Sequence, residues 1–215
     1  AQWSTTEIQF QYGIFDVPTF AAPPGTKQDT FNLLHQHSSG WSWGDAYYFV
    51  EFVSAFNNRE FPFGIEDVYG ELYLNFSSGK LFGAEYGGVL ADIGIIQGLN
   101  YGLDPKVLKY LPGVRLSWDI PGFAFLNTDF TAYVDFSAGL FSGGSPAQGD
   151  SWMVVVNWIY SFSLCDQNFL FVGHVERIAG LKNELGFTVD VWFLGQPQIR
   201  WDLGHALGTE ADRKS

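Results

Sequence analysis

The sequence predicts an all-β protein, a transmembrane antiparallel up-and-down β-barrel in a single domain, 1–215. Three observations lead to this prediction. Aromatic residues make up 18% of the chain and charged residues only 16%, whereas soluble domains carry about 25% charged residues. No apolar run approaches the roughly 20 residues that a membrane-spanning helix needs. Many short segments instead alternate between apolar and polar side chains, as strands do when one face meets lipid.

The clearest alternation lies in the second half of the stretch from Gly40 to Asn75. The two alternating sets are Val68, Leu72, Leu74 and Phe76 on one side, and Tyr69, Glu71, Tyr73 and Asn75 on the other. A period of two places the sets on opposite faces of a strand. We interpret the apolar face as the one that meets lipid and the polar, aromatic face as the wall of a pore.

Other segments of the chain share this pattern, and about eleven strands are expected in all. They are 6–12, 29–38, 41–56, 67–77, 81–102, 114–119, 123–139, 151–162, 168–178, 185–194 and 198–203. Long loops are expected at 15–28, 57–66, 103–113 and 140–150, and tight turns at 38–40, 77–80 and 121–122. Long and short connections then alternate, as in outer-membrane barrels. Aromatic residues recur near strand ends, as interfacial girdles require; they are Trp3, Trp41, Trp152, Phe162 and Trp201.

Composition also excludes several functions. The net charge of -12 argues against nucleic acid as a partner, because phosphate binding needs a basic surface. The single Cys165 predicts an unpaired thiol near a turn. His35 and His37 share a strand face, but two ligands are too few for a metal site, and no catalytic Ser motif accompanies them. We therefore expect no cofactor, no metal and no enzymatic activity.

A water-soluble barrel that holds an apolar ligand is the alternative interpretation. The same alternation would then place the apolar face inside and the charges outside. Soluble barrels normally expose Lys and Glu along their strands, and Lys is nearly absent from the strands expected here. About eleven long strands would also enclose more volume than these side chains fill easily.

Three segments resemble the nucleoside-specific channel family of Tsx-like outer-membrane proteins. They are GWSWGDAYYFVEF (Gly40–Phe52), DVYGELYLNFS (Asp67–Ser77) and QPQIRWDLG (Gln196–Gly204). The W-x-W-G-D stretch at Trp41–Asp45 is the most specific part, and the resemblance covers most of the chain in order from TEIQFQYG onward. It implies a monomeric barrel of about twelve strands in the bacterial outer membrane that passes nucleosides. Some members of that family also serve as phage or colicin receptors.

The end of the chain departs from the family pattern. Members continue past the region of QPQIRWDLG into a final strand that ends in an aromatic residue, whereas this chain ends with the polar segment GTEADRKS. The last strand is thus expected to be missing from this sequence: either the chain is truncated, or its tail is divergent, or closure uses something that the sequence does not contain. An unclosed barrel would leave strand-edge hydrogen-bonding groups in lipid, at a cost of several kcal/mol each.

The polar strand faces define the candidate lumen. The residues chosen as solute-binding candidates are Asp45, Tyr47, Glu51, Tyr69, Glu71, Tyr73, Arg115, Asp119, Tyr133, Asp135, Trp192 and Arg200. The same faces carry Glu7, Asp129, His174, Glu176, Asp190 and Asp202. Aromatic rings stack on a base at about 1–3 kcal/mol each, and carboxylates accept hydrogen bonds from hydroxyls and amines while repelling phosphates. Arg115 and Arg200 are expected to pair with carboxylates across the lumen and to hold the wall rigid.

Overall fold

The structure is a computed structural model that describes residues 1–16, 25, 27–55 and 67–208. Its strands are β1 (Trp3–Asp16), β2 (Lys27–Trp41), β3 (Gly44–Ala55), β4 (Asp67–Ser77), β5 (Leu90–Gly102), β6 (Val107–Trp118), β7 (Phe123–Asp135), β8 (Ser151–Leu164), β9 (Gln167–Ile178), β10 (Leu181–Lys182), β11 (Thr188–Val189), β12 (Trp192–Gly195) and β13 (Gln198–Trp201). The helices are α1 (Ser78–Phe82), the 3-10 helix η2 (Leu140–Ser142) and α2 (Leu203–Ala206). No helix in these described residues is long and apolar enough to cross a bilayer.

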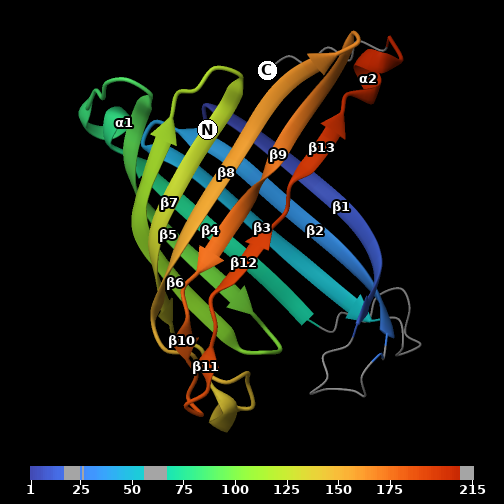
Figure 1. Ribbon diagram of the computed structural model, residues 1–215, viewed down its shortest axis with the longest axis vertical. Helices are drawn as coiled ribbons and strands as arrows, with labels where there is room; N and C mark the ends of the chain where they lie inside the picture. The colour runs from blue at the N-terminus through green and yellow to red at the C-terminus, as the bar shows by residue number, and fades with distance from the viewer. Residues whose placement is uncertain (17–24, 26, 56–66, 209–215) are drawn as a thin grey trace.

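The strands form an antiparallel up-and-down sheet, which confirms the predicted all-β class. The sheet has eleven strands in the order β1 to β9 followed by β12, with β13 also paired to β9. It curls into a half-barrel, with α1, α2 and the first residue at one end and the β10–β11 hairpin and η2 at the other (Figure 1). Among the described residues no ladder joins β1 to β12 or β13, so ladder pairing leaves the half-barrel open along that edge.

The strand that ends the sheet is broken in two. β12 pairs with Val175–Ile178 and β13 with Phe169–Val172, so both use β9 as their partner. The chain between them contains Pro197, which has no N–H to give to a ladder. Gly173 lies opposite the break, where a Cβ would come within 2.4 Å of the Gln196 carbonyl oxygen. The close approach of the two backbones at this point therefore depends on a glycine.

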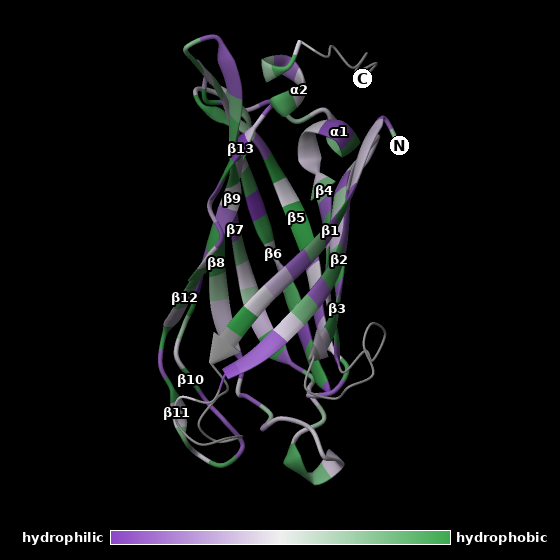
Figure 2. Ribbon diagram, turned by 90° about the vertical axis from the view of Figure 1, so that its right-hand side faces the viewer, coloured by the Kyte–Doolittle hydropathy of each residue, from purple (hydrophilic) through white to green (hydrophobic). Residues whose placement is uncertain are grey.

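The orientation predicted for the two strand faces is confirmed. Phe10 on β1 and Phe130 on β7 are 74% and 49% exposed on the outside, whereas the neighbouring Asp129 is 4% exposed on the inside. Colouring by hydropathy shows the alternation along the strands (Figure 2). The outer wall is mostly apolar, and the concave inner wall carries most of the ionisable side chains of the sheet together with a buried apolar cluster.

Two strand boundaries were predicted wrongly in the middle of the chain. The segment 81–102 is a strand only from Leu90, because Ser77 caps helix α1 by accepting the Lys80 N–H at 3.1 Å. The loop expected at 103–113 is wrong, since β6 begins at Val107. Pro112 is tolerated there because the β6–β7 ladder skips it, with pairs at Tyr110 and Gly113 but none between. The predicted alternation of long and short connections consequently fails between β4 and β6.

The strand predicted at 185–194 is also divided. β11 pairs with β10 in a separate two-stranded sheet, and only β12 joins the main sheet. The Asn183 side chain stabilises the turn between β10 and β11, because its Oδ1 accepts the N–H groups of Leu185 and Phe187 at 3.1 and 3.0 Å. The loop predicted at 57–66 and most of that at 15–28 lie outside the described residues.

Candidate functional site

A tyrosine–glutamate group is built around Glu71 at the middle of β4. Its carboxylate accepts hydrogen bonds from the hydroxyls of Tyr69 and Tyr73 at 2.5 and 2.9 Å and from Asn100 Nδ2 at 3.0 Å. The tyrosines lie two residues to either side of Glu71, so all three face inward, and Asn100 lies opposite Glu71 in the β4–β5 ladder. Gly98 makes room for Tyr73, since a Cβ there would lie 2.8 Å from its ring. Three donors hold Glu71 in place, so its role is to fix the two rings.

A second group connects the two edges of the sheet. The Tyr47 hydroxyl donates to Gln36 Oε1 at 3.2 Å, and Gln36 Nε2 donates to Glu7 Oε2 at 2.8 Å. The same Glu7 oxygen accepts a hydrogen bond from Arg200 Nη1 at 3.0 Å. Glu7 belongs to the first strand and Arg200 to the last, so this ion pair brings the two open edges together, which agrees with the pairing predicted for Arg200.

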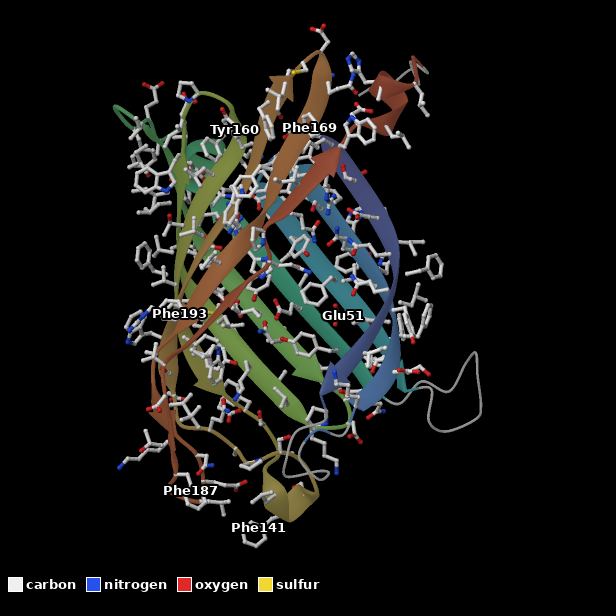
Figure 3. All side chains as sticks on the ribbon, turned by 45° about the vertical axis from the view of Figure 1, so that its right-hand side comes forward. Glu51, Phe141, Tyr160, Phe169, Phe187 and Phe193 are labelled. Carbon is white, nitrogen blue, oxygen red and sulfur yellow. The ribbon has the colours of Figure 1, made fainter. Side chains whose placement is uncertain are left out.

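Glu51 is the least constrained inward carboxylate of β3. It interacts with the Asn32 side chain and lies inside the curl of the sheet, where it is seen between β1 and β12 (Figure 3). Glu176 on β9 interacts electrostatically with Glu71 of β4. His174 lies two residues before Glu176, on the same inner face. These side chains give the inner wall acidic groups that a solute could contact.

Arg115 lies along the inner wall and pairs with two aspartates. Its Nε and Nη2 donate to Asp129 Oδ1 and Oδ2 at 2.7 and 2.8 Å, and its Nη1 donates to Asp45 Oδ1 at 2.9 Å. Asn75 Nδ2 also donates to Asp45, at 2.8 Å. Gly94 of β5 leaves the necessary space, because a Cβ there would lie 2.0 Å from Asn75 Oδ1. The predicted pairing of Arg115 is confirmed.

Lys109 forms a second buried ion pair near the loop end of β6. Its Nζ lies 3.0 Å from Asp135 Oδ2 and donates to Gln148 Oε1 at 2.9 Å. The same ammonium lies 5.3 Å from the centroid of the Tyr133 ring. Asp135 also accepts the backbone N–H of Ser137 at 2.7 Å. These contacts occupy Asp135, so the solute-binding candidate there instead anchors the long β7–β8 connection.

An apolar cluster fills the inner wall on the side of β6 to β9. It consists of Leu111, Tyr133, Met153 and Ile178, all buried, with Tyr73, Val155 and Trp192 packed against it. Three solute-binding candidates, Tyr73, Tyr133 and Trp192, thus contribute to packing. The sequence pattern does not distinguish a ring that faces water in a lumen from one that packs against apolar neighbours, because both occupy inward positions.

Three residues expected in the lumen lie elsewhere. Asp119 follows the last residue of β6 and is exposed in the turn before β7. Asp190 is exposed between β11 and β12. Asp202 caps helix α2 by accepting the His205 N–H at 3.0 Å. In each case the alternation of the sequence continues beyond the last residue that pairs in the sheet, so the predicted lumen position is wrong.

Several polar inner-wall residues were missed by the sequence analysis. Gln36, Asn75 and Asn100 all hydrogen-bond to solute-binding candidates or their partners. Their signal was present, because each occupies a polar position of an alternating segment, but only charged and aromatic residues were selected there. Lys109 was missed because its segment was predicted to be a loop.

His35 and His37 face outward together with Tyr48, as expected from their shared strand face. The Tyr48 ring lies 5.7 and 5.5 Å from the two imidazoles, and His37 Nδ1 lies 2.8 Å from Thr6 Oγ1. Within the described ranges no group of three or more His, Cys, Asp or Glu side chains could hold a metal ion.

No protein-family model, no curated protein and no solved structure matches this chain.

Proposed function

We propose that the chain is a passive bacterial outer-membrane channel for nucleosides or similar small, neutral, polar solutes. The observation that carries the proposal is the sidedness of the sheet, with large aromatic and aliphatic side chains exposed on the outside, and with Asp, Lys, Asn and Thr buried on the inside beside an apolar cluster. Only hydrocarbon outside and water inside make that arrangement favourable over whole strands. In this proposal the barrel is monomeric and has about 12 strands.

A channel needs a closed wall, because unpaired strand edges in lipid are costly. The contact between Glu7 and Arg200 supports closure, since it brings side chains of β1 and β13 within 3.0 Å of each other. Closure then requires that these edges pair with each other or with one more strand.

The inner wall suits a flat solute that carries hydroxyl groups. Tyr47 and Tyr69 offer ring faces on two adjacent strands, while Glu51 and Glu176 offer acceptors. Stacking contributes about 1–3 kcal/mol per base where it has been measured, which allows entry without trapping the solute. The acidic wall disfavours phosphorylated solutes such as nucleotides. Phage or colicin binding at the loop end belongs to the same proposal.

The test is conductance in planar bilayers with adenosine added at increasing concentration. The wild-type protein should form channels whose current falls as adenosine occupies the lumen, and Glu51→Gln should weaken that block. Asp166→Asn is the matched control, because it removes an exposed carboxylate at the β8–β9 turn and asparagine tolerates the φ of 59° found there. If the protein forms channels that adenosine never blocks, the channel proposal stands and the assignment of nucleosides as the solute is wrong.

A soluble barrel that binds an apolar ligand is the second candidate, and the cluster of Leu111, Met153 and Ile178 inside the curl favours it. Those side chains, however, bury one another. Purification separates the two candidates, because a soluble barrel would be monodisperse without detergent and a channel would not.

A further inference from the structure

Arg177 places a positive charge on the apolar outer wall near the loop end of β9. Its neighbour Ile178 is buried in the inner apolar cluster, so the side chain of Arg177 faces outward. In the ladders it lies between Val154 of β8 and Phe193 of β12. Phe193 lies on the outside of the sheet (Figure 3).

Two aromatic rings hold the guanidinium. Its central carbon lies 4.7 Å from the centroid of the Trp152 ring and 5.9 Å from that of Phe193. The rings are themselves 49% and 69% exposed, whereas Arg177 is half-buried between them. Cation–π contact orients an arginine without using its N–H donors.

The donors of Arg177 have no acidic partner in the part of the chain that the structure describes. The four ion pairs found there involve Lys109, Arg115 and Arg200, and Arg177 Nη1 is buried without a hydrogen-bond partner. Those three cations face inward, unlike Arg177, and each is neutralised by a carboxylate. A cation on the outer wall must instead find its counter-ion outside the protein.

We propose that Arg177, Trp152 and Phe193 form a binding site for the phosphate of an anionic lipid headgroup. The inference rests on the membrane location proposed above. Arg177 is the last but one residue of β9 and Trp152 the second residue of β8, so the site lies where strands end and the loops begin. Aromatic rings gather at this depth of a bilayer, and the planar guanidinium fork matches the oxygens of a phosphate.

The test is native mass spectrometry of the detergent-solubilised full chain with phosphatidylglycerol and phosphatidylcholine in equal amounts. Wild type should retain phosphatidylglycerol preferentially. Arg177→Gln should lose roughly tenfold of that preference, since one charge-assisted hydrogen bond contributes about that factor. Arg177→Lys should retain part of it, because the charge stays while the planar fork is lost. Lys182→Gln is the control: it removes an exposed cation of β10 nearby in the chain and should leave the preference unchanged.

Equal preference in wild type and Arg177→Gln would overturn the site, and so would complete displacement of the lipid by millimolar inorganic phosphate. A loss of thermal stability in Arg177→Gln without a change in lipid preference would show that the arginine only ties β8 to β12. If wild type forms channels but does not discriminate between the two lipids, this inference fails alone. If wild type is monodisperse without detergent, the membrane proposal fails first.

Discussion

The two sides of the inner wall use the same sequence pattern for different purposes. At the open edge of the sheet the polar side chains are partly exposed, since the Glu7 side chain of β1 is 34% exposed and its partner Arg200 of β13 is 39% exposed. On β6 to β9 the polar groups are enclosed, and the side chains of Arg115 and Asp129 are 11% and 5% exposed. The open edge leaves its ion pair accessible to water, whereas the side of β6 to β9 is a packed and ion-paired support. Inward position alone therefore does not indicate a binding role.

The largest expected effect on the free energy of unfolding comes from the enclosed ion pair of Arg115 and Asp129. Arg115→Met should lower the free energy of unfolding by about 3–5 kcal/mol, because it leaves the buried Asp129 without its cation. Urea unfolding of the micelle-bound protein, followed by tryptophan fluorescence, measures this change. Arg115→Met combined with Asp129→Asn should recover much of the loss, since the uncompensated charge is removed as well. A single variant as stable as wild type would show that the pair is hydrated.

The apolar part of the same side should respond almost as strongly. Met153 is 1% exposed at the centre of the cluster, and Met153→Ala should cost about 2–5 kcal/mol through lost burial and the cavity left behind. The same unfolding measurement applies. Val156→Ala on the outer face of β8 is the matched truncation and should cost clearly less, because detergent or lipid fills the space. Equal losses would mean that the outer face also packs against protein.

A substitution on the outer wall tests whether the apolar face of the sheet meets lipid, as proposed. Phe130→Lys should disfavour insertion into bilayers by about 2–4 kcal/mol if the residue lies near the midplane, as measured by folding into lipid vesicles at graded urea. Phe141→Lys, at the fully exposed η2 segment, should have little effect. If Phe130→Lys inserts as well as wild type, or makes the protein more soluble without lipid, the apolar wall does not face a membrane.

The sequence was sufficient to predict the sidedness of the strands, because a period of two fixes which side chains share a face regardless of partners. It was not sufficient to predict where strands end. Asp119 continues the alternation of β6 yet lies in a turn, and Lys109 lies in a strand although proline and glycine follow it. Those boundaries depend on ladder partners and side-chain anchors such as Asp135, which come from distant parts of the chain.

The same limit explains the mixed outcome for the candidate site. Tyr69, Glu71 and Tyr73 were found together because they follow one another on one strand. Trp192 and Tyr133 were predicted to contact a solute, but they pack against Met153 and Ile178. The local sequence pattern does not indicate which strands are neighbours, so this packing could not be predicted from it. Tertiary packing thus decides which inward aromatic rings remain available.

The smallest expected effect belongs to the ion pair at the open edge. Arg200→Gln should change the free energy of unfolding by only about 0–1 kcal/mol, because a partly exposed pair gains little over its hydrated ions. The change should shrink further in 1 M salt, where the screening length is roughly 3 Å. Unfolding at low and high salt measures both quantities. A salt-independent loss as large as that of Arg115→Met would place Arg200 in an enclosed environment, which requires β1 and β13 to be sealed together. The contrast between an open side and an enclosed side would then disappear at the very edge where the barrel has to close.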